Sequence, residues 1–414
     1  MVLLMRLQSI QVPSFFLCPI SLDLMKDPVT LCTGMTYDRS SIEKWLDEGN
    51  LTCPATNQLL GSTVVTPNHT LRRLIQDWCV LNQSNGVERI PTPKLPARLE
   101  DVKAMVEDLK YGINVHETVK RLRGLARESD KNKRLVVESG AVQELVSLIV
   151  LPANDCQSPK REWVEFKEDI LATIVLISSA DVTRASYNAS SKQMACLCWF
   201  LKNGQIEAKV NAAVVLESIA SSSDLKGSIA DLEGVIETMV QLLREKFYPK
   251  AVKASLRCLL TLCATRRNRI RLVEAGGVAA LVEFLPGAET RGTLERALRI
   301  LELLASCAEG REAISDHALA IPVLLKLVLR ASGASIEHAV VVLYMLSEYS
   351  VNASDVRKSI VQVGGFPRLL LLLQTECTLR TKGKAIKLLK QLRPIWNECP
   401  CSSGGRALST VGSI

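Results

Sequence analysis

Apolar residues along most of the chain follow a helical period, and two kinds of helix alternate in it. One kind begins just after a glycine, at Gly140, Gly234, Gly276 and Gly364, and a version without the glycine covers 320–328. The other kind is rich in alanine and leucine. Its last apolar residue falls at Leu125, Ile177, Ile219, Leu262, Leu304, Leu346 and Leu392, at successive intervals of 52, 42, 43, 42, 42 and 46 residues.

This spacing predicts a solenoid of helical repeats. The intervals lie in and near the range of armadillo and HEAT repeats. One such repeat cannot bury its own apolar face, but stacked repeats share a continuous core. The glycine allows a backbone turn or a close approach that a side chain would block. We expect an armadillo-like right-handed α-solenoid over residues 99–393.

A different pattern occupies residues 10–84, where short elements alternate with loops. The first predicted helix begins with Ser40 and Glu43, which have the spacing of a capping box, and ends at Gly49. One face of this helix is apolar because of Ile42, Trp45 and Leu46.

A second helix is predicted to start at Asn68, a favourable N-cap residue. Its apolar face carries Leu71, Leu74, Ile75 and Trp78. Segments 29–31 and 35–37 flank a Cys-Thr-Gly turn and predict a short hairpin. Loops remain at 15–22 and 52–58, and both keep apolar residues beside a proline.

A domain of this size has little core and often needs a disulfide or a metal. The sequence argues against zinc, because Cys18, Cys32, Cys53, Cys79 and His69 are scattered and form no C-x₂-C pair. We therefore expect no metal and no other cofactor. Polar contacts are expected instead from the charged residues Asp27, Asp38, Arg39 and Glu43.

Six short motifs follow one another in this region. They are Cys-Pro-Ile-Ser (18–21), Met-x-Asp-Pro-Val (25–29), Gly-x-Thr-Tyr-Asp-Arg (34–39), Ile-x-x-Trp-Leu (42–46), Cys-Pro-x-Thr (53–56) and Thr-Pro-Asn (66–68). In order and spacing they resemble a U-box, the zinc-free relative of the RING domain in ubiquitin ligases. The expected fold of this region is therefore a small α+β, RING-like U-box.

The resemblance implies that a ubiquitin-conjugating enzyme docks on the two loops and on the groove of the first helix. Val29 falls in a motif that bears on this contact in plant members. Asn57 stands where many members carry an arginine that touches donor ubiquitin and the conjugating enzyme, and asparagine is shorter and uncharged. By position, the docking residues would be Ile20, Leu22, Trp45 and Pro54.

Structural roles compete with these assignments. Trp45 lies on the apolar face of a helix, so a place in the core is favoured over a contact. Ile20 and Pro54 lie on predicted loops, where packing explains an apolar residue less well, and a contact is favoured. Cys18 and Cys53 are expected to be small core residues rather than covalent carriers of ubiquitin.

Composition supports a mainly helical chain without a nucleic-acid platform. Of the 414 residues, 47% are hydrophobic but only 4% are aromatic, which suits helix-on-helix packing. The formal net charge is +8, and the basic excess lies after residue 90. It is interleaved with acids, and the one dense cluster, 266–271, is better explained as a solvated helix turn than as a binding patch.

Thirteen cysteines without a pairing pattern indicate free thiols in a reducing compartment. The chain shows no core of a signal peptide and no run of 18 apolar residues. We expect no membrane span, and a location in the cytoplasm with the nucleus as the second option.

The sequence also allows predictions for a linker, for the C-terminal segment and for one short motif in the repeats. Residues 85–98 are punctuated by proline and predict a semi-rigid linker. Residues 394–414 are rich in small residues and predict a disordered tail, from which Trp396 docks on the last repeat. Trp199 and Asn203 give a single Trp-x-x-x-Asn match, too few for the groove of an importin-like cargo receptor.

No phosphate-binding loop, zinc-protease motif or nucleophile elbow occurs, and His338 is expected to be structural. The whole chain resembles the plant U-box/armadillo ubiquitin ligases. This implies a substrate protein on the repeats, direct transfer of ubiquitin to lysine without a catalytic nucleophile, self-ubiquitination, and work in stress and defence signalling. The alternative is a non-catalytic armadillo scaffold, which Asn57 leaves open.

Overall fold

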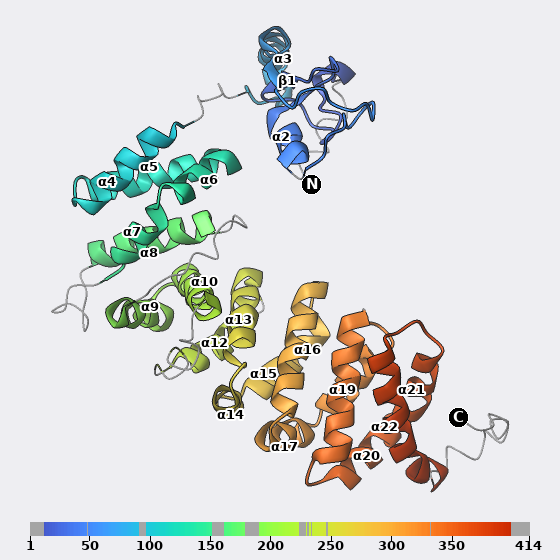
Figure 1. The fold of residues 1–414 in the computed structure, drawn as a ribbon. Coiled ribbons are helices and arrows are strands. Elements are labelled where there is room, and N and C mark those ends of the chain that lie inside the picture. The colour runs from blue at the N-terminus through green and yellow to red at the C-terminus, as the bar shows by residue number, and fades with distance from the viewer. Residues whose placement is uncertain are drawn as a thin grey trace. The chain divides into compact units, whose positions relative to one another are not determined.

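The computed structural model describes residues 12–47, 49–90, 97–150, 161–178, 190–222, 229, 232, 234–245, 247–331 and 333–398. The chain divides into two compact units, Met1–Ala97 and Arg98–Ile414 (Figure 1). The prolines of residues 152–159, in the longest interval between aligned positions, predict a loop, which lies outside the described residues.

The first unit is a small α+β domain. β1 is the middle strand of a three-stranded antiparallel sheet with the order β2-β1-β3. The predicted hairpin is confirmed as β1 and β2, whereas β3 was not predicted. The elements are η2 (Ser14–Phe16), β1 (Pro28–Thr30), β2 (Thr36–Asp38), α2 (Arg39–Asp47), β3 (Thr66–Pro67), α3 (His69–Leu81) and η3 (Gln83–Asn85).

The start of α2 differs from the predicted capping box. Ser40 lies inside the first turn, and its Oγ donates a 2.7 Å hydrogen bond to Asp38 Oδ2. Glu43 does not reach back to cap the helix, because it faces the Arg39 guanidinium at 3.5 Å. The same guanidinium donates to Asp27 Oδ2 at 2.6 Å, so these charged residues do supply cross-links in the domain.

Asn68 caps α3 as predicted, since its side-chain oxygen accepts from the Leu71 N–H at 3.0 Å. The core of the unit surrounds β1, β2 and the two helices. Val87 and Ile90 are also buried in it, so packing continues past the predicted domain end at residue 84. The buried residues are Phe16, Cys18, Met25, Val29, Leu31, Tyr37, Ile42, Cys53, Leu60, Ile75, Cys79, Val87 and Ile90.

The second unit consists of helices and one short 3₁₀ turn in its described part. None of its described helices has the length and apolar character needed to cross a membrane. The elements are α4 (Leu99–Lys110), α5 (Val115–Glu128), α6 (Asp130–Glu138), α7 (Ala141–Ser147), α8 (Arg161–Ser178), α9 (Ser191–Asn203), α10 (Ile206–Ser222), α12 (Val235–Arg244), α13 (Pro249–Leu262), α14 (Arg266–Glu274), α15 (Gly277–Phe284), η4 (Leu285–Gly287), α16 (Arg291–Ala305), α17 (Ala308–Asp316), α18 (Ala320–Leu327), α19 (Gly333–Tyr349), α20 (Ala353–Gln362), α21 (Gly365–Leu373) and α22 (Leu379–Glu398).

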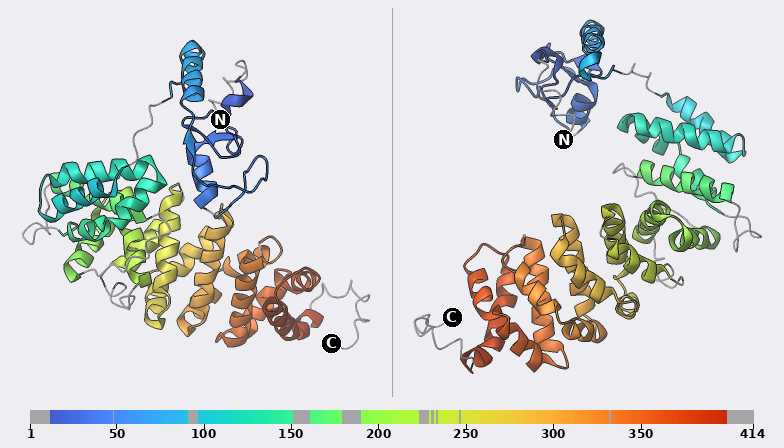
Figure 2. Two further views of the ribbon diagram at one scale, coloured as in Figure 1. Left: turned by 45° about the horizontal axis from the view of Figure 1, so that its top comes forward. Right: turned by 180° about the vertical axis from the view of Figure 1, so that it is seen from behind.

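Helix positions confirm the predicted repeat. The seven aligned apolar residues fall one each in α5, α8, α10, α13, α16, α19 and α22. These helices pack against one another in chain order, as both views in Figure 2 show. Leu262, Leu304 and Leu346 are buried in the shared core.

The repeated glycine has the predicted role. Gly140, Gly234, Gly276 and Gly364 precede α7, α12, α15 and α21 with φ between 77° and 82°, a left-handed conformation that side chains disfavour. Gly277, which follows Gly276, is needed for a different reason, because it has no room for a side chain. A Cβ there would lie 2.4 Å from Leu272 Cδ1.

Charged side chains link neighbouring helices of the stack. The carboxylate of Glu302 in α16 is buried and lies 2.5 Å from His338 Nδ1 in α19 and 3.1 Å from Arg380 Nη2 in α22. Arg299 of the same helix lies 2.9 Å from it, and Arg380 also reaches Glu337 at 2.9 Å. His338 is therefore structural, as predicted, because it ties two repeats together.

The arginine cluster at 266–271 also serves the fold. It forms α14, and Arg269 donates to the carbonyls of Cys263 at 3.0 Å and Ala264 at 3.1 Å, just after α13 ends. Orphan carbonyls at a helix C-terminus are stabilised by such a cation. The lone Trp-x-x-x-Asn match is local too, since Asn203 Nδ2 donates to the Trp199 carbonyl of its own helix.

The end of the solenoid extends beyond residue 393. Helix α22 continues through Pro394 to Glu398, so the beginning of the predicted disordered tail is helical, and residues 399–414 lie outside the described part. Trp396 stacks on Phe366 with ring centroids 5.0 Å apart, which confirms that it docks on the last repeat.

We predict that Glu302→Gln destabilises the repeats by about 2 kcal/mol at pH 7, because three partners lose a buried charged acceptor. Burial raises the pKa of Glu302, but His338 and Arg299 outweigh it and lower the pKa below its usual value. The contribution of Glu302 is thus present above its unfolded pKa of about 4.3 and is lost as the pH falls below it.

Denaturant unfolding at pH 7 and at pH 3.5 measures this difference, with the exposed Glu283→Gln as the matched control. The deficit of the Glu302 variant should shrink at the lower pH. An equal deficit at both values, or none at pH 7, would contradict the assigned role.

Candidate functional site

Two loops of the first unit share one backbone design. In the first loop, residues 17–24, the Cys18 N–H donates to the Asp23 carbonyl at 2.9 Å, and the Leu22 N–H donates to the Cys18 carbonyl at 2.8 Å. Leu17 and Leu24 close the loop through an antiparallel bridge.

The second loop, residues 52–59, repeats this arrangement. The Cys53 N–H donates to the Gln58 carbonyl at 2.8 Å, and the Asn57 N–H donates to the Cys53 carbonyl at 2.8 Å. Thr52 and Leu59 form the closing bridge. The shared sequence Cys-Pro-x-Ser/Thr therefore encodes the same turn twice.

Each loop needs one residue in the left-handed conformation. Leu22 has φ 59° and Asn57 has φ 56°. Asparagine visits this region readily, whereas leucine does so at a cost of roughly 1 kcal/mol. The structure thus gives a backbone reason for Asn57 and leaves a strained, exposed leucine at the matching position of the first loop.

The Cys18 sulfur is buried and accepts hydrogen bonds from several N–H groups. The Asp38 N–H in β2 donates to it at 3.3 Å. Burial raises the pKa of the Cys18 thiol, but the backbone N–H groups of Ser21, Asp38 and Ile20 outweigh burial and lower the pKa. The Cys18 sulfur is therefore a shared hydrogen-bond acceptor that fixes the backbone of the first loop.

The Cys53 sulfur plays the same part in the second loop. Tyr37 Oη lies 3.0 Å from it, and Thr33 Oγ1 donates to it at 3.5 Å. Burial raises the pKa of the Cys53 thiol, but hydrogen bonds from Thr33, Thr56 and Tyr37 outweigh burial and lower the pKa to about 6. Tyr37 Oη also accepts from the Ala55 N–H at 3.0 Å.

Strand β2 therefore holds both loops. The Tyr37 hydroxyl of this strand is hydrogen-bonded to the Cys53 sulfur, and the N–H of the next residue, Asp38, donates to the Cys18 sulfur. This is why two segments 35 positions apart in the chain are fixed with respect to each other. Among the residues that the structure describes, no three His, Cys, Asp or Glu side chains come together as a metal site.

The apolar residues predicted in the first loop are at the surface. Ile20 is 37% exposed and Leu22 is 73% exposed, although both are large and hydrophobic. Val29 differs, since it is 0% exposed in the middle strand β1. A direct contact between Val29 and a partner is excluded in this conformation, because its side chain is needed inside the core.

Trp45 and Pro54 are half-buried. Trp45 packs against the core, and its indole N–H donates to the Thr52 carbonyl at the base of the second loop at 2.8 Å. The core role expected for Trp45 is therefore confirmed, and its contact with a partner stays a prediction. Asn57 is exposed at the end of the same loop.

Sequence reasoning missed Tyr37 as a residue that holds the site. Its hydroxyl connects the second loop to the sheet, but the Gly-x-Thr-Tyr-Asp-Arg motif does not reveal the hydrogen-bond partners of that hydroxyl. The repetition of Cys-Pro-x-Ser/Thr at 18–21 and 53–56 was the available signal for two equivalent loops.

A RING-like domain with two such loops, followed by stacked helical repeats, defines a U-box protein with an armadillo region. Family models agree: the U-box domain matches residues 12–84, and the plant U-box protein ARM repeat region matches residues 98–410. The chain belongs to the family of plant U-box proteins that carry an armadillo-repeat region.

Relatives from Arabidopsis thaliana match nearly end to end. U-box domain-containing protein 25 is 40% identical over 400 residues, covering 94% of this chain and 92% of its own. E3 ubiquitin-protein ligase PUB23 is 36% identical over 406 residues, covering 95% and 96%. The crystal structure of an engineered protein covers 70% of this chain and 68% of its own at a TM-score of 0.51 and 24% identity, which bears on the fold alone.

We predict that Tyr37→Phe loosens the second loop without unfolding the unit. The change leaves the Ala55 N–H and the Cys53 sulfur without this partner, which costs about 0.5–1.5 kcal/mol. Hydrogen exchange at the Ala55 amide should accelerate, whereas the exposed Tyr111→Phe serves as a control. Unchanged protection at Ala55 would show that the hydroxyl does not hold the loop.

Proposed function

We propose that the protein is a U-box ubiquitin-protein ligase that recruits a ubiquitin-charged conjugating enzyme through its two loops. The armadillo repeats hold the substrate protein, and a substrate lysine attacks the thioester directly. The observation that carries the docking surface is the pair Ile20 and Leu22, two exposed apolar side chains on a loop whose backbone is fixed by Cys18.

The rigidity of the first loop supports this surface. A strained backbone persists only where the surrounding structure enforces it, and such strain gathers at functional positions. Leu22 adopts the left-handed φ that the turn needs, and the residue is 73% exposed, so packing inside the domain does not explain why a leucine stands there. A partner that binds this leucine finds it already ordered, which lowers the entropic cost of binding.

The chemical contribution of the ligase is proximity. Holding a lysine and a thioester together converts an encounter between two molecules into a step within one complex. Neither Cys18 nor Cys53 serves as a carrier of ubiquitin in this mechanism, since both sulfurs are buried and engaged as acceptors. We expect a small, transient interface with the conjugating enzyme, below about 1,200 Å² in total.

Asn57 is the candidate contact with donor ubiquitin. Its exposed amide can donate and accept hydrogen bonds at the end of the second loop. It lacks the charge and reach of an arginine, so we expect it to restrain the thioester less strongly. Trp45 and Pro54 complete the docking surface, and Val29 supports it from the core.

We predict that an Ile20→Ala, Pro54→Ala double variant loses self-ubiquitination, because truncation of two interface residues weakens docking by at least about tenfold. The assay combines the full-length protein with activating enzyme, ubiquitin, a panel of conjugating enzymes and a chelator. Circular dichroism confirms that the variant folds.

The outcomes of this assay distinguish a ubiquitin ligase from a non-catalytic scaffold. Ladders that survive the chelator and vanish in the variant support recruitment through the loops. No ladder from the unchanged protein with any conjugating enzyme would favour the scaffold alternative. Ladders that persist in the variant would place the recruiting surface elsewhere.

A second prediction separates binding from folding at Leu22. Leu22→Asn places a residue that tolerates the left-handed backbone there, so the stability of the unit should be unchanged or higher by up to about 1 kcal/mol. Binding to the conjugating enzyme should weaken about tenfold, because the apolar contact is lost. Isothermal titration and denaturant unfolding measure the two effects.

The exposed Leu81→Asn on α3 removes the same kind of side chain away from the loops and should leave binding unchanged. Equal binding by both variants would show that Leu22 is not a contact.

A further inference from the structure

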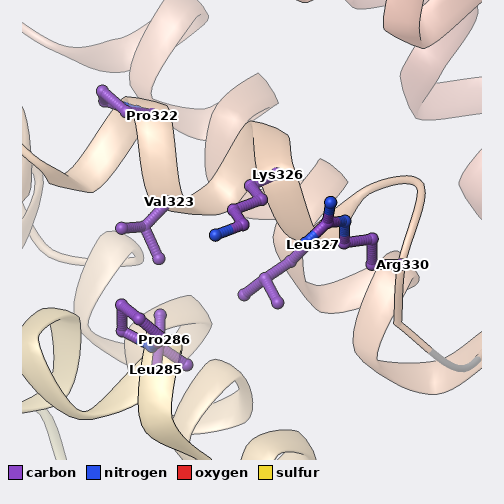
Figure 3. Close-up of a pocket in the computed structure, with 7 residues that line it drawn as sticks. All are labelled: Leu285, Pro286, Pro322, Val323, Lys326, Leu327 and Arg330. Atoms are coloured by element: carbon purple, nitrogen blue, oxygen red, sulfur yellow. The ribbon is translucent and has the colours of Figure 1, made fainter.

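A surface pocket lies between two successive repeats of the second unit. One side is formed by Leu285 and Pro286, where α15 continues into η4, and the other side by α18 (Figure 3). Its volume is about 270 Å³. The helices that carry the aligned leucines, α16 and α19, contribute no lining residue, so the pocket belongs to a different helix layer.

The pocket coincides with an interruption of the repeat pattern. Helix α12 packs closely against α15, but α15 and α18 do not pack together in the same way. Helix α18 is also the version that lacks the preceding glycine, with Leu319 at its N-cap and φ −89°. Prolines stand on both sides of the gap, at 286 and 322.

The lining combines an apolar floor with two cations. Val323 and Leu327 of α18 point toward Leu285, as Figure 3 shows, and this floor is apolar throughout. Lys326 lies in the last turn of α18, Arg330 lies in the turn that follows the helix, and both are exposed. Neither forms an ion pair or a side-chain hydrogen bond with any residue in the described part of the chain, and no acidic side chain lines the pocket.

We propose that this pocket binds an acidic segment of a partner protein, with one or two aliphatic anchor residues on the floor and carboxylates beside Lys326 and Arg330. The volume lies just below the range of roughly 300–1,000 Å³ for small-molecule sites, so it suits side chains better than a cofactor. Unpaired cations at an apolar groove attract an occupant of opposite charge.

The charge pattern favours a peptide over a membrane. Recruitment to anionic lipid generally takes clusters of about four to eight basic residues, whereas only two line this pocket. The pocket is lined by side chains of two successive repeats, so a peptide bound in it contacts both repeats. This binding does not depend on the proposed ligase activity and is measured without ubiquitin.

The experiment probes the full-length protein with an array of 12-residue peptides. Each peptide carries a Leu, Ile, Met or Phe anchor followed by zero to four glutamates, with glutamine versions as uncharged partners. The best binder is then labelled with fluorescein for anisotropy titration. Phosphatidylinositol bisphosphate vesicles are tested beside it.

The test variant is Lys326→Glu, Arg330→Glu. The matched control is Lys387→Glu, Lys390→Glu, which reverses two exposed charges on α22 outside the pocket. We expect glutamate peptides to bind the unchanged protein and the control alike, and the test variant about tenfold more weakly. Binding should also weaken with salt and with a serine in place of the anchor.

Four results would overturn the proposal. They are equal binding by the test and control variants, equal binding of glutamate and glutamine peptides, no peptide binding up to about 1 mM, and binding of the vesicles alone. A circular dichroism spectrum shared by both variants excludes misfolding as the cause of a loss. A self-ubiquitination assay that fails while the peptide still binds would separate this proposal from the proposed function.

Discussion

The two loops of the first unit depend on hydrogen bonds to two buried sulfur atoms. Cys18 and Cys53 each accept bonds from their own loop and from strand β2, and neighbouring residues of that strand reach the two sulfurs. A hydrogen bond to a sulfur acceptor is electrostatically stronger in a buried site than in water. The position of each loop is thus set from inside the domain, and Ile20 and Leu22 can stay in solvent without loosening the fold.

The repeats are held by a shared apolar core and by charges that cross from one helix to the next. The core alone would permit neighbouring helices to slide, because hydrophobic contact is not directional. Glu302 is bound from two other repeats by His338 and Arg380, and this fixes the register between them. Arg269 performs a related task at the end of α13. Polar groups therefore fix how neighbouring helices are aligned, and buried leucine and alanine side chains hold the helices together.

Sequence pattern predicted the elements that repeat and missed those set by single distant contacts. Leucine positions such as Leu262 and Leu304 predicted the helices, since burial recurs at a fixed period. Val29 was expected to bear on the contact and lies in the core, because a three-residue strand is too short for alternation to reveal its buried face. The capping box failed because Arg39 competes for Glu43. The bond from Tyr37 to Cys53 spans 16 positions and leaves no periodic trace.

The stacked rings of Phe366 and Trp396 lie on the last repeat that the structure describes. Each repeat offers an apolar face that the next repeat covers, so the last face is a template for another copy of the chain. Trp396 lies on that last repeat and reduces the apolar surface left there. One aromatic residue beyond a proline thus covers part of this apolar face, and without its ring more of the face would be open to another copy of the chain.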